Sequence, residues 1–118
     1  MNWQTNHTPA PELWTCVVYA IELHLSVLKD SAFMNANPRY VAGMSCFYIG
    51  MTSLLVEERY LQHTLGTKNV ARIPHVYGRK LRQDMVPQRT PTRRTWAMRQ
   101  EKTLALQLRA QGYGIWQA

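Results

Sequence analysis

Three residues occupy positions at which their chemistry suggests a reactive site. Arg59 and His63 are four residues apart, so on a helix they lie on one face, one turn from each other. Glu101 falls in the middle of an apolar helical stripe, where an unpaired carboxylate is costly. We therefore expect a cation, a metal ion or a cluster of hydrogen bonds to compensate the Glu101 side chain.

Hydrolysis of a phosphodiester bond could use this set together with Tyr19 and Tyr48, which lie in two apolar, strand-like segments. The reaction needs a deprotonated water, charge neutralisation at the transition state and a stabilised leaving oxygen. Arginine presents a planar fork to phosphate oxygens. A carboxylate can hold Mg²⁺, which keeps several waters. A tyrosine near a metal ion and an arginine can share in activating water, because both cations lower its pKa.

Each of these residues also has a purely structural interpretation. The two tyrosines could be strand aromatics that pack a sheet. Arg59 and His63 could form a solvated helix face, and Glu101 could form an ion pair with Arg94 or another base. The residue types alone leave both interpretations open.

Hydrophobic periodicity predicts the elements that position these side chains. A polar segment, 29–45, contains Asn37-Pro38 and Gly43 and is expected to be a loop, and a short helical turn is expected before Tyr77-Gly78. Strands are expected at 14–25, 46–50, 80–86 and, as a final edge strand, 113–116; helices are expected at 54–65 and 92–111.

The first long helix is expected to pack through leucines. Leu54, Leu61 and Leu65 form a narrow apolar stripe, and Arg59 and His63 lie nearly opposite it. This arrangement predicts that Arg59 and His63 point away from the core, toward solvent or a cleft. Thr52 or Ser53 is expected to cap the helix at its start, and Gly66 to end it.

Positive charge is concentrated in the second half of the chain. Residues 1–67 carry three basic and five acidic side chains, a net charge of −2, whereas the remainder carries eleven basic and two acidic, a net charge of +9. Such a surface attracts polyanions, above all phosphate backbones, although it can also serve solubility alone. The candidate nucleic-acid-binding residues are Lys68, Arg72, Arg79, Lys80, Arg82, Arg93 and Arg94.

Length and composition favour one globular domain. The chain has 118 residues, of which 46% are hydrophobic and 18% charged. We expect an N-terminal lead at 1–13 and a single domain at 14–118. No signal peptide or membrane-spanning segment is evident, so a soluble, cytoplasmic protein is predicted. Cys16 and Cys46 lie in apolar segments and are expected to be reduced, with a disulfide between neighbouring strands as the alternative.

The order of these motifs resembles that of the GIY-YIG nuclease family. Val17-Val18-Tyr19 stands at the first motif and Tyr48-Ile49-Gly50 at the second. Arg59 and His63 follow one turn apart, and Glu101 comes late on a long helix. Tyr77-Gly78 and Gly112-Tyr113 also look like family positions. The resemblance covers roughly residues 14–116.

The resemblance implies an α/β (α+β) fold with a three-stranded, mostly antiparallel sheet flanked by helices. It implies an endonuclease that hydrolyses phosphodiester bonds in DNA, possibly RNA, with Mg²⁺ (or Mn²⁺). Tyr19 and Tyr48 would line one side of the site, and Arg59 would hold the scissile phosphate. His63 would assist proton transfer or contact the substrate, and Glu101 would bind the metal.

The chain also departs from the family pattern. Its first motif keeps only the tyrosine, and the long segment between the motifs suggests that the Asn37-Pro38 loop borders the substrate. An asparagine that many members place after the metal-binding Glu is absent, and Gln117 is the candidate substitute. A nucleic-acid-binding module with a degenerate site, or a domain that binds an acidic protein, are the alternative functions. His24 and His75 are not expected to be catalytic.

Overall fold

The two strands that carry Tyr19 and Tyr48 are the central pair of the sheet. The computed structural model describes residues 15–67 and 69–118, so Trp14, Lys68 and the N-terminal lead lie outside the described residues. Strand β2 (Val17–Leu23) pairs antiparallel with β3 (Cys46–Thr52), and Tyr19 lies opposite Gly50. Both strands begin and end within a few residues of the predicted segments.

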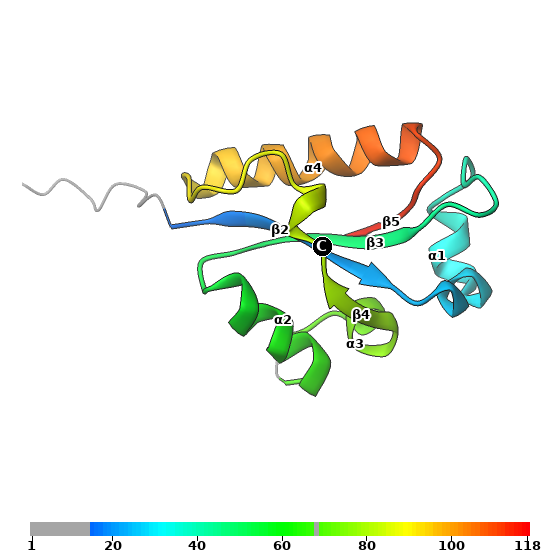
Figure 1. Cartoon of the computed structure of the whole chain (residues 1–118), viewed down its shortest axis with the longest axis horizontal. Coiled ribbons are helices and arrows are strands. Elements are labelled where there is room, and N and C mark those ends of the chain that lie inside the picture. The colour runs from blue at the N-terminus through cyan, green and yellow to red at the C-terminus, as the bar shows by residue number, and fades with distance from the viewer. Residues whose placement is uncertain (1–14, 68) are drawn as a thin grey trace, which may run out of the picture.

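Two shorter strands complete the sheet in the order β4-β2-β3-β5 (Figure 1). Strand β4 (Gly78–Leu81) pairs antiparallel with β2, and β5 (Gly114–Gln117) pairs parallel with β3. The α+β class is therefore confirmed. The expected three-stranded sheet is wrong for the described residues, because the predicted final edge strand is a fourth member that runs parallel to β3.

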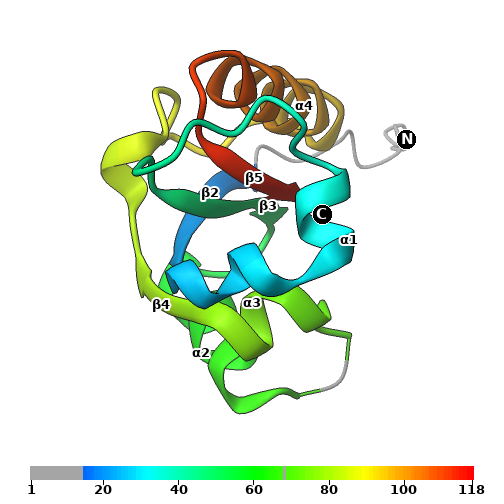
Figure 2. The ribbon, with the colours of Figure 1, turned by 90° about the vertical axis from the view of Figure 1, so that its right-hand side faces the viewer.

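Helices cover both faces of this sheet (Figures 1 and 2). Helix α4 (Arg94–Ala110) lies on one face, and three shorter helices lie on the other. The segment expected to be a loop contains part of this second layer. The short helices and the two 3-10 helices are α1 (Ser31–Asn35), α2 (Val56–Leu65), α3 (Arg72–Tyr77), η1 (Leu25–Lys29) and η2 (Gln83–Met85).

Strand alternation divides the core into two parts. On the α4 face, Val18 and Ala20 of β2 pack with Phe47 and Ile49 of β3 and with Leu104 of α4. On the other face, the core joins the opposite set of strand residues to the short helices: Tyr19, Ile21, Leu23, Cys46, Tyr48, Val27, Phe33 and Ile73. Successive side chains of a strand point to opposite faces, so the sheet separates the two cores.

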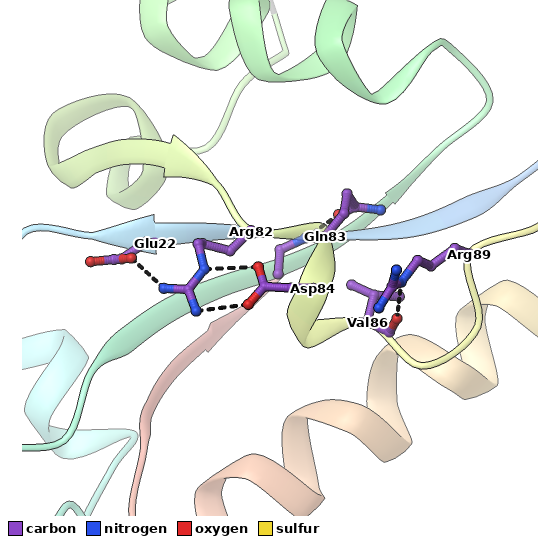
Figure 3. Close-up of polar contacts among 7 residues, drawn as sticks. Glu22, Arg82, Gln83, Asp84, Val86 and Arg89 are labelled. Carbon is purple, nitrogen blue, oxygen red and sulfur yellow. Dashed lines mark hydrogen bonds and ion pairs between the residues drawn. The ribbon is translucent and has the colours of Figure 1, made fainter.

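The predicted third strand, 80–86, is shorter than expected and begins earlier. It ends at Leu81 because the chain turns at Arg82, whose φ/ψ of −132/63 leave the strand path. The Arg82 guanidinium donates to the Asp84 carboxylate at 2.8 Å and to Glu22 at 2.6 Å (Figure 3). The side chain of Gln83 then bonds the backbone of Val18 and Ala20, where a longer strand would have paired.

The predicted packing face of α2 is wrong. His63 is fully buried, whereas Leu61 and Leu65 are 55% and 66% exposed and Leu54 is also exposed. Val56 and Tyr60 of the same helix pack against the core beside His63. Leu55, rather than Thr52 or Ser53, stands at the N-cap position without a side-chain hydrogen bond, whereas Gly66 ends the helix in a left-handed conformation as expected.

Buried Asn37 ties the end of α1 to β5. Its amide donates to the carbonyl oxygens of Phe33 and Ile115 at 2.8 and 3.0 Å, and its Oδ1 accepts from the Ile115 N–H at 2.8 Å. Both cysteines are free and buried, as expected. No helix within residues 15–67 and 69–118 has the length and apolar character needed to cross a membrane.

Asn37→Ala should destabilise the fold by about 1–3 kcal/mol, because it removes the hydrogen bond to the Ile115 N–H and one of the two hydrogen bonds at each of the Phe33 and Ile115 carbonyl oxygens. Urea unfolding followed by circular dichroism measures this loss. Asn35→Ala, at an exposed position on the same helix, is the matched control and should change stability by less than about 0.5 kcal/mol. An equal effect of the two substitutions would contradict the assigned role of Asn37.

Candidate functional site

Tyr19, Tyr48 and His63 form a buried cluster between the sheet and α2. The Tyr19 hydroxyl lies 2.8 Å from His63 Nε2. The ring centroid of Tyr48 is 6.1 Å from that of Tyr19 and 5.2 Å from that of His63. Residues 44 positions apart in the chain are thus joined by a hydrogen bond, and three of the five predicted catalytic side chains are in mutual contact.

Gly50 makes room for this cluster. It faces Tyr19 across the strand pair, and a Cβ added at Gly50 would lie 2.7 Å from the Tyr19 hydroxyl oxygen and 2.8 Å from its Cζ. Those distances are shorter than any side-chain contact allows, so only glycine lets the phenol ring lie across β3. The space that the Tyr19 ring needs therefore explains the glycine of the Tyr48-Ile49-Gly50 motif without reference to any protein family.

Burial keeps the imidazole of His63 neutral near pH 7. Loss of solvation lowers its pKa to about 4, and the positive charges of Arg59 and His75 act in the same direction. His63 Nδ1 is buried and, among the described residues, has no hydrogen-bond partner. His75 Nδ1 donates to the His63 backbone carbonyl at 2.9 Å, so His75 helps to fix the end of α2.

The surroundings of Tyr19 and Tyr48 raise the pKa values of the two phenols to different extents. Burial raises the pKa of Tyr19, but the neighbouring Arg59 guanidinium and Tyr48 hydroxyl oppose this rise. Burial raises the pKa of Tyr48 further, and the Tyr19 phenol adds to that increase. Tyr19 is therefore the phenol of the pair that ionises more easily.

Arg59 lies beside this cluster on α2. Its guanidinium donates to Gln62 Oε1 at 2.7 Å and to the Asn69 carbonyl oxygen at 3.0 Å. Among the described residues it forms no ion pair with a carboxylate. Its positive charge shifts the pKa of Tyr19, Tyr48 and His63. Arg59 is therefore a half-buried cation next to the phenols, and within residues 15–67 and 69–118 no carboxylate forms an ion pair with it.

Glu101 is on the other face of the sheet, on α4. The residue is only 5% exposed, and burial raises the pKa of its carboxyl to about 7. A hydrogen bond with Gln117 lowers this pKa and so opposes part of the effect of burial. The two residues line a surface pocket of about 450 Å³ together with Met51 of β3 and Met98 and Lys102 of α4. The alternative interpretation, an ion pair of Glu101 with Arg94 or another base, is not seen among the described residues, and Gln117 forms a hydrogen bond with Glu101.

The carboxylate and the phenols are nevertheless electrostatically connected. The negative charge of Glu101 raises the pKa of both Tyr19 and Tyr48. Strand β5 pairs with β3 only as far as Gln117 opposite Ile49, while β3 continues to Thr52. Glu101 and Gln117 line their pocket together with Met51, in the part of β3 that extends past β5, and Tyr19 lies opposite Gly50, the residue before Met51.

A metal ion at Glu101 would have few protein ligands. The described residues contain no group of three or more His, Cys, Asp or Glu side chains that could share an ion. The side-chain groups at this pocket that could coordinate a metal ion are the Glu101 carboxylate and the Gln117 amide oxygen. This oxygen-only set fits Mg²⁺, which is often bound through one or two carboxylates and retains several waters.

The predicted nucleic-acid-binding residues fall into two groups. Arg72 pairs with Asp30 at 2.8 Å and Arg79 lies 3.8 Å from Glu22, while Arg82 bridges Glu22 and Asp84 (Figure 3). Lys80, Arg93 and Arg94 are exposed and form no such ion pair among the described residues. Lys68 lies outside the described residues.

A scan against protein-family models and searches of curated proteins and of solved structures find no match to this chain. The functional argument therefore depends on the geometry of the site and on the motif order in the sequence.

Gly50→Ala should break the hydrogen bond between Tyr19 and His63, because the added methyl group and the phenol ring would occupy the same space. We expect a loss of about 1–3 kcal/mol in the free energy of unfolding, typical of an overpacked core. Chemical denaturation provides the measurement, and Ser53→Ala, exposed just beyond β3, is the control. Unchanged stability with a retained Tyr19–His63 contact would show that the site has more room than the structure indicates.

The His63 imidazole should titrate near pH 4 in the folded protein and near its ordinary value of about 6.5 in urea. NMR titration of the ¹⁵N-labelled imidazole provides this measurement. Because the folded pKa is the lower one, this histidine's contribution to stability is complete above pH 6.5 and is lost as the pH falls through 4, by about 3 kcal/mol at most. A folded-state midpoint above pH 6 would disprove the assigned burial.

Proposed function

We propose that this chain is a metal-dependent endonuclease that hydrolyses phosphodiester bonds in DNA. The observation that supports this best is the buried contact of 2.8 Å between the Tyr19 hydroxyl and His63 Nε2, beside an arginine that has no acidic partner in the part of the chain that the structure describes. A purely structural tyrosine–histidine pair would not require a cation next to it. The motif order and the basic second half of the chain agree with a phosphate-containing substrate.

Arg59 would hold the scissile phosphate. Its hydrogen bonds to Gln62 and Asn69 fix the guanidinium plane, so that little side-chain freedom is lost when a phosphate binds. The remaining N–H groups can donate to phosphate oxygens. As charge grows on the phosphate in the transition state, this fixed cation stabilises it.

Tyr19 and His63 would orient the attacking water and take up its proton. In the free protein both groups are neutral, so the hydrogen bond between them sets the direction of the phenol. A bound phosphate anion would raise the pKa of His63 from its value of about 4, because nearby negative charge favours the imidazolium. Substrate binding would thus make the pair a better base when one is needed.

Glu101, assisted by Gln117, would hold the metal ion. Bound there, Mg²⁺ (or Mn²⁺) would supply positive charge that stabilises the transition state. A carboxyl with a pKa of about 7 must lose its proton to bind a cation, so metal affinity should fall as the pH drops below 7. The pKa of Glu101 is raised because burial removes solvation from its charged form.

Nucleic acid would approach along the basic side chains that no carboxylate neutralises. Lys80, Arg93 and Arg94 are the strongest of the predicted contacts for this reason. Arg82 is held by Glu22 and Asp84 and stacks over Phe47 at 5.5 Å, so its main role is to close the turn after β4. DNA is the proposed partner, with RNA as a second substrate to be tested, and a cytoplasmic location stays a prediction.

Glu101→Gln should abolish Mg²⁺-dependent nicking of supercoiled plasmid, because an amide cannot supply the negative charge that holds the ion. Gel electrophoresis measures nicking, and thermal melting with and without Mg²⁺ gives a second measurement. Mg²⁺ should raise the melting temperature of the wild type and leave that of Glu101→Gln unchanged. Glu57→Gln, at an exposed position of α2, should behave as wild type in both assays.

The same variant has an expected effect on stability. Folded Glu101 keeps its proton up to about pH 7, whereas the unfolded carboxyl releases it near 4.5, so the wild type loses stability relative to Glu101→Gln between pH 5 and pH 8. The difference should reach about 3 kcal/mol at most. The nuclease proposal would be wrong if the wild type nicked no DNA with Mg²⁺ or Mn²⁺ while Arg59→Ala and Glu101→Gln left its affinity for DNA unchanged. The alternative, a non-catalytic nucleic-acid-binding module, would then be the function.

A further inference from the structure

A second pocket lies on the flank of α4 away from Glu101. Its volume is about 360 Å³, within the range of small-molecule sites. Val18 of β2, Val86 after η2 and Leu104 of α4 are its apolar lining. None of the residues proposed for phosphodiester hydrolysis lines it.

The rim of this pocket combines one aromatic ring with several amides. Trp96 is 51% exposed, although tryptophan has more apolar surface to bury than any other residue type on this helix. The side chains of Gln88, Gln100 and Gln107 also line the pocket, and each offers both hydrogen-bond donors and an acceptor. The Arg99 guanidinium lies 5.3 Å from the centroid of the Trp96 ring.

The wall formed by residues 86–88 is held in place by hydrogen bonds (Figure 3). The Gln83 side chain anchors η2 to β2 through the Val18 carbonyl and the Ala20 N–H. Arg89 Nε donates to the Val86 carbonyl at 2.9 Å and so closes the turn that follows. The pocket therefore exists before any ligand binds, and the ligand does not have to order it.

Shallow hollows connect this pocket with the Glu101 pocket across α4. Met98 and Lys102 line both the Glu101 pocket and a surface hollow on the helix, and Arg99 lines both that hollow and the Trp96 pocket. The connecting surface thus carries Arg99 and Lys102, two exposed cations. A polyanionic strand that crosses α4 along this path would have its phosphates next to positive charge throughout.

We propose that the Trp96 pocket binds an unstacked base of single-stranded DNA next to the cleavage site. This inference rests on the proposed nuclease function, because it assigns the neighbouring part of the same substrate. Every base has a π face that can stack on an exposed aromatic ring, and stacking of this kind is a general means of binding single strands. The three glutamine amides would pair with polar edges of the base, while the apolar floor covers its remaining surface. A base within a duplex is already stacked and cannot enter.

Binding of a fluorescein-labelled single-stranded 12-mer tests this proposal by anisotropy, in EDTA and at constant salt so that no cleavage occurs. Trp96→Ala should weaken binding about tenfold. Trp96→Phe, which keeps an aromatic face, should weaken it less than about threefold. Leu106→Ala, at an exposed position of α4 outside the pocket, is the matched control and should bind as wild type. Affinity for the corresponding duplex should be the same for all four proteins.

An oligonucleotide of the same length with abasic sites identifies the group that is bound. Wild type should bind it about as weakly as Trp96→Ala binds the normal strand. Equal affinities of wild type and Trp96→Ala for the normal strand would overturn the proposal, and so would equal losses on single strand and duplex. Glu101→Gln should keep the preference for single strands, so a failed nuclease proposal and a failed base pocket give different results.

Discussion

A single buried hydrogen bond, between the Tyr19 hydroxyl and His63 Nε2, determines much of this architecture. It joins the central strand of the sheet to α2, and it requires the imidazole to face inward. Because a helix cannot present His63 and Leu61 to the same side, the leucines of α2 are left in solvent. Gly50 serves the same contact, since any larger residue would displace the phenol. The packing face of α2 is thus the one with Val56, Tyr60 and His63, and not the leucine stripe.

The sequence predicted most elements, because strand alternation and the long helical stripe of α4 are strong signals. It placed the helix α2 but failed for its packing face, because Leu54, Leu61 and Leu65 give a regular apolar pattern and are nevertheless exposed. The pattern contained no information on the partner that His63 finds 44 residues earlier in the chain. The third strand was placed too late for a similar reason, since the Gln83 side chain takes the positions on β2 that further strand residues would pair with.

For the candidate site too, the local sequence pattern predicted the burial of single residues but not the contacts between residues far apart in the chain. That Glu101 needs compensation could be predicted from its place in an apolar stripe, and it is indeed buried with a raised pKa. Its contact with Gln117 depends on β5 lying parallel to β3, a long-range pairing that periodicity does not encode. The same holds for the hydrogen bonds of Asn37 to the backbone of Ile115 in β5, which join residues far apart in the chain.

The sheet also separates two parts of the candidate site, the cluster of Tyr19, Tyr48 and His63 and the carboxyl group of Glu101. Tyr19, Tyr48 and His63 are buried on the face of the sheet that the short helices cover, and Glu101 is buried on α4, which covers the other face. The two parts nevertheless influence each other through charge, since the negative charge of Glu101 raises the pKa of Tyr19 and Tyr48. A single substitution at Glu101 would therefore alter the acidity of two tyrosines on the opposite side of one thin layer of backbone.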